Sequence, residues 1–251
     1  MHRHLVTPEA LLADTCELGK EEARHLQTVL RVKQGDEIQL FDGQGRTRQA
    51  VVKELTKHAL TLSNIAPAVL HAKPSCALTL FACVSKGKHM DWTIEKAVEL
   101  GVARIVPVVS ARTIVRIESE DRDAKKDRWM RIAEEAARQC GSAWLPEILA
   151  PCSLVESLAL VKTTTPTFVA ALTPDAKPLR ECLAQGGQED KGSGFRAAQA
   201  GWFVGPEGDF TPEELVQLQA AGAIPVSLGK NVLRTETACL YGLSCLNSAW
   251  L

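Results

Sequence analysis

Two loops near the carboxyl end of the chain carry the residues that could do chemistry. The first loop, 205–210, reads Gly-Pro-Glu-Gly-Asp-Phe, and the second, 228–237, reads Leu-Gly-Lys-Asn-Val-Leu-Arg-Thr-Glu-Thr. Glycines at both ends of a Gly-Pro-Glu-Gly turn bring main-chain N–H and C=O groups close to a bound molecule, because no Cβ intervenes. In the second loop, Arg234 and Glu236 place a cation and a carboxylate close to a glycine. Together the loops predict a ligand site.

Short apolar strands precede both loops and must position them. Gly201–Val204 leads into the first loop and Ile224–Leu228 into the second. A helix begins at Thr211, because Pro212 suits the first helical position and Glu214 completes a capping box. A single strand followed by a glycine turn and a helix is common wherever an α/β chain changes direction, so one such unit does not indicate a site. Two of them with charged residues favour a site at the carboxyl ends of the strands, where open α/β sheets bind ligands.

Composition indicates an ordinary globular protein. The chain has 251 residues, is 45% hydrophobic and carries a net charge of −1. This length suits two domains. No apolar run approaches the roughly 18 residues of a membrane span, and the amino terminus lacks the apolar core of a signal peptide. We therefore expect a cytoplasmic protein that does not bind membranes.

Cysteine and histidine spacing gives no sign of a metal site or a disulfide framework. The eight cysteines include no C-x-x-C pair, and most lie in apolar segments. They are predicted to be reduced core residues, and no metal is expected. Among the six histidines, only His25 is retained as a possible RNA contact. Basic clusters that include Arg46 and Arg48 favour nucleic-acid binding weakly, because charge runs are usually solvated faces.

The pattern of the chain changes near residue 72. Before it, alternating segments predict an antiparallel meander or small barrel, fed by a helix at Glu21–Leu30. After it, strands and helices alternate, which predicts an α/β domain with a mostly parallel sheet. A glycine- and charge-rich stretch, Gly186–Gln199, is predicted to be a mobile surface loop. The predicted elements are the strands Asp36–Phe41, Arg46–Leu55, His58–Ser63, Leu78–Val84, Arg104–Val109, Thr167–Leu172, Gly201–Val204 and Ile224–Leu228, with helices at Asp91–Leu100, Ala124–Cys140, Pro178–Gln185, Thr211–Ala221 and Thr235–Trp250.

Several motifs, in this order, resemble one known family. The two loops are similar to those of the bacterial 16S rRNA uridine-N3 methyltransferases called RsmE, in the SPOUT class of S-adenosylmethionine-dependent enzymes. The similarity covers nearly the whole chain. Its further motifs are His25-x-x-x-Val29-Leu30-Arg31, Gly35-Asp36, Lys86-Gly87-x-x-Met90, Lys96-x-x-Glu99-Leu100-Gly101-Val102, Trp129 and Gln139-x-Gly141.

The resemblance implies a fold that periodicity alone does not give. Residues 1–72 would form a PUA-like RNA-binding β-barrel, and 73–251 a homodimeric SPOUT methyltransferase domain with a C-terminal trefoil knot. S-adenosylmethionine would bind among the glycine loops and their apolar neighbours. The implied cofactor-binding residues are Leu172, Thr173, Val204, Gly205, Pro206, Glu207, Gly208, Leu228, Gly229, Val232, Leu233, Thr235, Thr237 and Ala238.

The implied reaction needs little from the protein beyond positioning and charge. The methyl group of the cofactor is already activated, so holding it in line with uracil N3 is the main task. N3 must lose its proton or have it polarised, and Arg234 can stabilise the resulting anion through its fixed donors. Glu236 and Glu207 are candidates for the base, although each can instead have a structural role. The substrate would be 16S rRNA of the small ribosomal subunit, contacted by Arg24, His25, Arg31 and Lys86, with the target uridine unpaired or extruded.

Three alternatives remain open, and three positions depart from the family pattern. The chain could bind the cofactor and assist ribosome assembly without catalysis, or it could methylate a different RNA. It could also use the first loop as an anion cradle at a helix N-terminus, although Glu207 and Asp209 would repel phosphate. Ala111, Ser142 and Asn231 stand where many relatives carry charged residues.

Overall fold

The computed structural model describes residues 2–28, 31–56, 59–174, 176–185 and 198–250. The chain forms two compact units, which are Met1–Lys73 with Ala137–Leu145, and Pro74–Ala136 with Pro146–Leu251. The first unit therefore ends close to the predicted boundary at residue 72, but it also includes residues 137–145, which pack with it. Arg3 donates hydrogen bonds to the carbonyls of Ala137 and Ser142. Trp144 Nε1 also donates to the carbonyl of Ala72, 3.2 Å away.

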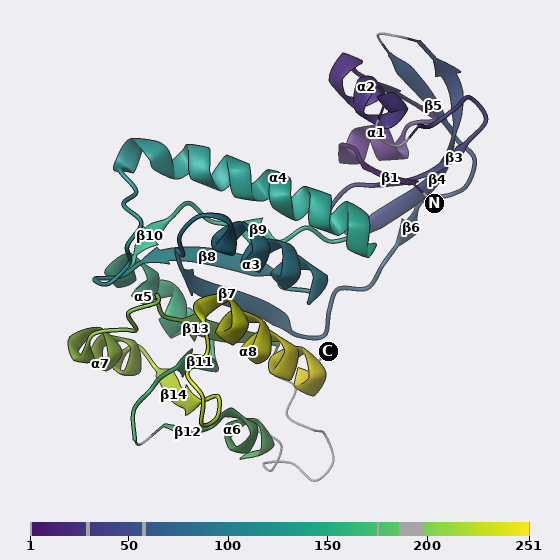
Figure 1. Cartoon of the computed structure of the whole chain (residues 1–251). Helices are drawn as coiled ribbons and strands as arrows, with labels where there is room; N and C mark the ends of the chain where they lie inside the picture. The colour runs from purple at the N-terminus through teal and green to yellow at the C-terminus, as the bar shows by residue number, and fades with distance from the viewer. Residues whose placement is uncertain (1, 29–30, 57–58, 175, 186–197, 251) are drawn as a thin grey trace. The chain divides into compact units, whose positions relative to one another are not determined.

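The first unit is built on one mainly antiparallel sheet. Its strands are β1 (His2–Leu5), β2 (Thr15–Leu18), β3 (Glu37–Phe41), β4 (Arg46–Leu55), β5 (Leu60–Asn64) and β6 (Val69–Leu70), in the order β1-β3-β4-β5-β2, with β6 on β4. β1 and β3 run parallel, and the other pairs are antiparallel. Two helices, α1 (Pro8–Leu12) and α2 (Lys20–Thr28), complete the unit (Figure 1). Leu26 of α2 and the fully buried Ile38, Leu60 and Leu62 belong to one apolar core.

The second unit contains an eight-stranded sheet among the described residues, and every pairing in it is parallel, as predicted. The strand order is β10-β8-β7-β13-β11-β14-β12, with β9 on β8. The strands are β7 (Ala77–Cys83), β8 (Arg104–Val109), β9 (Glu147–Ile148), β10 (Cys152–Ser153), β11 (Thr167–Ala170), β12 (Lys177–Pro178), β13 (Gln199–Val204) and β14 (Ala223–Ser227). β13 therefore lies between two strands that precede it in the chain, β7 and β11.

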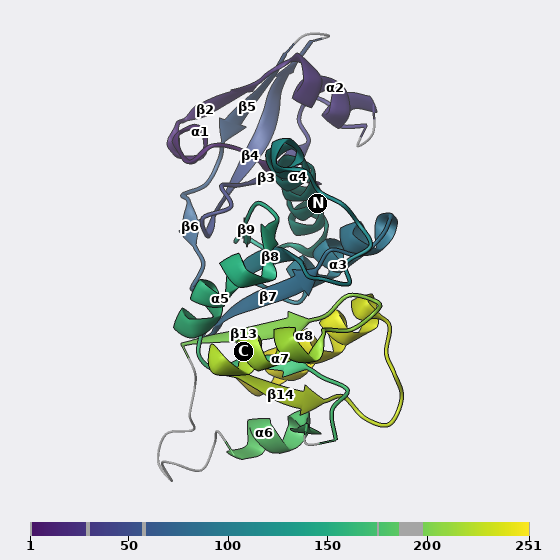
Figure 2. The same ribbon diagram turned by 90° about the vertical axis from the view of Figure 1, so that its left-hand side faces the viewer.

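Helices cover both faces of this sheet. They are α3 (Lys88–Glu99), α4 (Arg122–Cys140), α5 (Leu154–Thr163), α6 (Leu179–Gln185), α7 (Pro212–Ala220) and α8 (Thr235–Trp250). Trp202 of β13 packs against Gly242 of α8, and α8 also contacts β7 and α3 (Figures 1 and 2). The next residue, Phe203, points to the opposite face because side chains alternate along a strand. There it stacks on Phe81 within the core that holds α5 and α7.

Several elements differ from the sequence prediction. Helix α5 was not predicted, although Ser153 and Glu156 form a complete capping box at its start. Strand β13 begins at Gln199, two residues earlier than expected. The capping box of Thr211 and Glu214 is confirmed. Most of the predicted loop 186–199 lies outside the described residues, as do residues 29–30 of the predicted helix Glu21–Leu30.

Candidate active site

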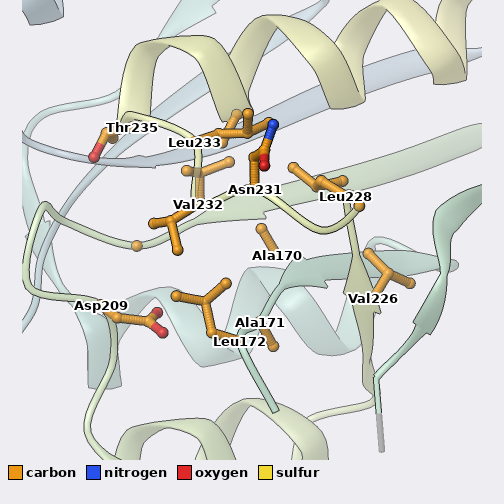
Figure 3. Close-up of a pocket in the computed structure, with 14 residues that line it drawn as sticks. Ala170, Ala171, Leu172, Asp209, Val226, Leu228, Asn231, Val232, Leu233 and Thr235 are labelled. Atoms are coloured by element: carbon orange, nitrogen blue, oxygen red, sulfur yellow. The ribbon is translucent and has the colours of Figure 1, made fainter. Parts of the chain in front are cut away.

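A cavity that is partly open to solvent lies at the carboxyl ends of β11, β13 and β14. Three loops and the start of α8 form its wall, and Figure 3 shows their side chains gathered around one hollow. This is the edge of a parallel sheet at which α/β proteins bind ligands. The lining residues are Ala170, Ala171, Leu172, Val204, Gly205, Asp209, Val226, Leu228, Gly229, Asn231, Val232, Leu233, Thr235 and Ala238.

In the first glycine loop, a residue other than glycine takes the left-handed conformation. The residue with a positive φ is Asp209, at 59°, whereas Gly205 and Gly208 have none. Both glycines are needed for close packing within the protein. A Cβ on Gly205 would lie 3.1 Å from the ring of Phe210, and one on Gly208 would lie 3.3 Å from Cβ of Arg112. The glycines therefore admit neighbouring side chains.

Two side chains fix this loop to the rest of the unit. Arg112, in the segment after β8, donates to the carbonyl of Gly208 at 2.8 Å and to that of Phe210 at 3.4 Å. The buried Glu214 accepts from the main-chain N–H of Ala111 at 2.7 Å and from that of Thr211 at 2.9 Å. Four main-chain groups of two loops are thus satisfied by one arginine and one glutamate.

The second loop combines a glycine turn with an apolar rim. Gly229 has φ +123°, a conformation that favours glycine, and its N–H donates to the Ser227 hydroxyl. Val232 is 76% exposed, and Leu172, from the loop after β11, is 63% exposed. Both side chains line the same cavity (Figure 3). Exposed apolar walls of this kind suit a flat, partly apolar ligand.

A second hollow shares part of this wall and carries the charged groups. Val232, Leu233 and Thr235 line both cavities, and the second one adds His89, Glu207, Arg234 and Glu236. His89 Nδ1 lies 3.3 Å from Glu236 Oε1; the histidine side chain is 54% exposed and the glutamate 15%. No ion pair within the described part of the chain involves Arg234, whose side chain is exposed. The predicted catalytic pair therefore lies directly beside the cavity.

The structure does not place every predicted cofactor residue on the cavity wall. Leu172, Val204, Gly205, Leu228, Gly229, Val232, Leu233, Thr235 and Ala238 line it. Pro206, Gly208 and Thr173 do not, although each neighbours a lining residue in the chain. Glu207 lies on the second hollow, and Thr237 lies on a separate surface of α8.

Several lining residues were not predicted from the sequence. Ala170, Ala171 and Val226 are ordinary strand residues, and no motif marks them. Asp209 and Asn231 lie inside the two loops, and the polar side chains of those loops could have been included. His89 was missed as well. Its only signal is its place within the Lys86-Gly87-x-x-Met90 motif after a buried strand.

Three of the four predicted RNA-contacting residues are exposed to solvent. Arg24, Arg31 and Lys86 are exposed, whereas the side chain of His25 lies outside the described part of the structure. Two other basic residues serve internal contacts. Arg48 donates to the carbonyls of Leu11, Leu12, Ala13 and Ala66, and Arg46 pairs with Asp42 at 3.3 Å.

The residues that depart from the common family pattern have local roles. The main-chain N–H of Ala111 donates to Glu214. The Ser142 hydroxyl donates to the carbonyl of Trp144 at 2.7 Å and accepts from its N–H at 3.1 Å. Asn231 lines the main cavity. Small or neutral side chains are therefore accommodated at all three positions.

All eight cysteines are free thiols, and Cys16, Cys76, Cys83 and Cys239 are buried. Burial raises the pKa of the Cys83 thiol to about 12. Across the described residues, no group of three or more His, Cys, Asp or Glu side chains could hold a metal ion. The helices seen there are also too short or too polar to cross a membrane.

Comparison with known families agrees with this architecture. Residues 72–247 match the RNA methyltransferase domain family, and residues 18–63 match the RNA methyltransferase PUA domain. The two matches define an RNA methyltransferase of α/β fold with a PUA domain. Ribosomal RNA small subunit methyltransferase E of Synechocystis sp. is 30% identical over 259 aligned residues, which cover 98% of this chain and 77% of the relative. The chain belongs to the ribosomal RNA small subunit methyltransferase E family, which confirms the predicted resemblance.

Two further relatives show how far the likeness extends. Ribosomal RNA small subunit methyltransferase E of Bacillus subtilis is 26% identical, with 94% of this chain and 90% of the relative aligned. The crystal structure of the corresponding enzyme from Neisseria gonorrhoeae, bound to S-adenosyl methionine, is similar with a TM-score of 0.83. It is 31% identical, and the match covers 100% of this chain and 98% of that one.

Proposed function

We propose that this protein transfers a methyl group from S-adenosylmethionine to N3 of a uridine in the 16S rRNA of the small ribosomal subunit. The observation that carries the proposal is the pair of adjoining cavities. One has apolar walls suited to a cofactor, and the other presents Arg234, Glu236 and His89 along a shared wall. The family and the cofactor in the Neisseria gonorrhoeae enzyme support the same assignment.

The residues of the main cavity fit S-adenosylmethionine. Leu172 and Val232 offer exposed apolar surfaces for the adenine ring, and strand ends and glycines leave main-chain groups available for the polar parts. Asp209 supplies a carboxylate on the wall, which suits a ligand with a positive sulfonium. When bound, the cofactor supplies an activated methyl group. The protein then needs to orient the uracil and stabilise its charge.

Arg234 is the proposed stabiliser of the uracil anion. Loss of the N3 proton leaves negative charge that spreads over the two ring oxygens. A guanidinium offers several N–H donors in a fixed fork and remains charged at all relevant pH values. Because no described residue forms an ion pair with Arg234, its charge is not neutralised in advance. Glu236, on the same wall, is proposed to assist proton removal.

The proposed RNA contacts are exposed basic residues. Lys86 lies in the segment between β7 and α3, in the second unit, and Arg24 and Arg31 are exposed in the first. Contacts of lysine and arginine with phosphate position an RNA without reading its sequence. N3 lies on the base-pairing edge, so the target uridine must be unpaired or flipped out of a helix.

A homodimer is proposed on the basis of an apolar surface formed by α3, α6 and α8. Trp92 is 42% exposed and Tyr241 is 46% exposed, and both line one shallow depression with Leu183, Leu240 and Ala249. Homodimer interfaces are enriched in aromatic residues and depleted in charge.

The strand order, in which β13 enters between β7 and β11, supports a SPOUT fold with a C-terminal trefoil knot. A PUA-like barrel in the first unit and a cytoplasmic location complete the proposal.

The proposal is tested by methyl transfer from isotopically labelled S-adenosylmethionine to small ribosomal subunits that lack the modification. Mass spectrometry of the released nucleosides should find label in 3-methyluridine. Label in a different nucleoside would refute the N3 assignment. If no label is transferred, calorimetry of cofactor binding separates two explanations. A protein that binds the cofactor normally does not act on this RNA, whereas a protein that does not bind it lacks the proposed cofactor site.

A further inference from the structure

We propose that His89 accepts the N3 proton of the target uridine and that Glu236 orients the imidazole for this role. The inference rests on the proposed function. It begins from the distance of 3.3 Å between His89 Nδ1 and Glu236 Oε1 and from the position of both residues on the hollow that holds Arg234. Catalytic hydrogen bonds are often long in the absence of substrate and shorten when it binds.

Two helix starts bring these side chains together. His89 is the second residue of α3, and Glu236 is the second residue of α8. The two helices pack side by side on the sheet (Figure 1). Glu236 lies in the first turn of α8, where the helix dipole favours an acidic side chain. An ionised Glu236 beside Nδ1 favours the neutral tautomer with its proton on Nδ1, which leaves the lone pair on Nε2.

His89 is better suited to this step than the carboxylates of the same hollow. Glu207 and Glu236 share it with Arg234, and the Glu236 carboxylate already faces His89 Nδ1. Histidine is the side chain whose proton affinity matches neutral pH. Its exposed edge can reach substrate, because 54% of the side chain is accessible. Arg234 remains free to stabilise the anion.

The proton and electron balance of the step is simple. The N3–H bond breaks, and its proton moves to Nε2 of His89. The electron pair left on N3 forms the new bond to the methyl carbon, and the carbon–sulfur bond breaks with its electrons going to sulfur. The imidazolium then returns its proton to solvent. No oxidant or further reactant is required.

Several other charged groups surround His89 and shape any pH dependence. Three of them line the same hollow, and two lysines precede and flank His89 in the sequence. An aspartate in the first turn of α3 and the arginine of α4 that pairs with it complete the set. These groups are Glu207, Arg234, Glu236, Lys86, Lys88, Asp91 and Arg128.

The first test compares His89→Gln with wild type in single-turnover methylation across pH, at saturating RNA and cofactor. Glutamine keeps a polar side chain of similar length but cannot take up the proton, so the rate at pH 7 should fall by about 100-fold. The deficit should shrink at alkaline pH, where uridine N3 ionises unaided. Lys162→Gln, which removes an exposed cation of α5 that does not line the hollow, should keep the wild-type pH profile. Added imidazole should partly restore the His89→Gln rate.

The outcomes separate this inference from the proposed function. If wild type forms 3-methyluridine and His89→Gln keeps its rate within about two-fold, or loses the same factor at every pH, His89 is not the proton acceptor and the function stands. If wild type forms no 3-methyluridine, both fail.

A second measurement needs no cofactor. Nitrogen NMR of the histidine ring in the free protein should show the proton on Nδ1 of neutral His89, and Glu236→Ala should remove that preference. The opposite tautomer in wild type would overturn the role of Glu236.

Discussion

The guanidinium of Arg234 is the strongest candidate for charge stabilisation in this chain. It lies in a hollow lined by two carboxylates and a histidine, immediately before the first turn of α8. Removing a donor aimed at developing negative charge typically lowers a rate by two to three orders of magnitude. The same removal leaves the walls of the main cavity in place.

Arg234→Ala is therefore expected to lower methyl transfer at least about 100-fold with little change in cofactor affinity. Transfer would be followed with labelled cofactor, and affinity by calorimetry. Lys230→Ala serves as the control, because it removes a cation from the same loop that lines neither cavity. Arg234→Lys should remain impaired, since an ammonium lacks the planar fork. Wild-type turnover of Arg234→Ala would contradict the assignment.

The thiol of Cys83 makes the protein sensitive to alkaline pH. Burial raises its pKa from 9.0 to about 12 in the folded state. Below pH 9 the thiol is protonated whether the chain is folded or not, so stability is undiminished. Between pH 9 and 12 only the unfolded chain releases this proton, so the contribution of this one thiol to the free energy of unfolding falls by about 1.4 kcal/mol per pH unit.

Denaturant unfolding at several pH values, in the presence of a reductant, would measure this slope. Cys83→Ala should lower stability at pH 7 by leaving a small cavity but should make the decline above pH 9 shallower. Cys140→Ser, at an exposed thiol, should leave the slope unchanged. An unchanged slope in Cys83→Ala would show that this thiol does not contribute.

At the scale of elements, α5 and α7 allow a matched comparison. Both begin with a capping box, formed by Ser153 with Glu156 and by Thr211 with Glu214. Glu214 is buried and also accepts from Ala111 N–H, whereas Glu156 is exposed and lies 3.4 Å from Arg122. The box of α7 therefore joins two loops as well as starting a helix.

Glu214→Ala is expected to destabilise the fold by about 2 kcal/mol, because it leaves the partly buried N–H groups of Ala111 and Thr211 without their acceptor. Glu156→Ala should lose about 1 kcal/mol or less, as for an ordinary cap. Chemical denaturation gives both values. Because Ala111 lies beside Arg112, which holds the first glycine loop, Glu214→Ala should also weaken cofactor binding. Equal losses in the two variants would argue against the second role of Glu214.

Local signals predicted the elements that make the site. The parallel sheet followed from the alternation of strands and helices, and α7 from its capping box. Short β1, β2 and α1 gave weak periodic signals, since four or five residues show little pattern. No sequence motif identifies residues such as Ala170 as part of the site either. They line the cavity only because β11 ends beside β13 and β14.

The placement of His89 shows what local signals cannot give. His89 precedes Glu236 by 147 positions in the sequence. They meet because α3 and α8 both pack against the same layer of the unit, which depends on the strand order β8-β7-β13-β11. The conformation of Asp209 was missed for a similar reason. Its positive φ accompanies the packing of Phe210 against Gly205, and a residue other than glycine rarely adopts such angles.

At the scale of the whole molecule, the apolar surface of α3, α6 and α8 predicts self-association. Tyr241→Asp would place a charge in this surface, and the resulting desolvation should favour the monomer. Light scattering at micromolar concentration should then give a mass near 27.2 kDa in place of twice that value. Val216→Asp provides the control, because Val216 is 63% exposed on α7, away from this surface. A wild-type protein with the monomer mass would contradict the dimer.

The contact between Trp202 and α8 has a consequence for the order of synthesis. Trp202 Nε1 donates to the carbonyl of Ala238 at 3.1 Å, and both Ala238 and Thr235 close the main cavity. The three strands that border the cavity, β11, β13 and β14, precede α8 in the sequence. The ribosome therefore synthesises them before the residues that complete the wall. A nascent chain that has not yet extended past residue 238 has no finished site. Ribosomes must release most of this protein into solvent before it can acquire a ligand there, so chains cut short ahead of α8 should be unable to compete for the cofactor.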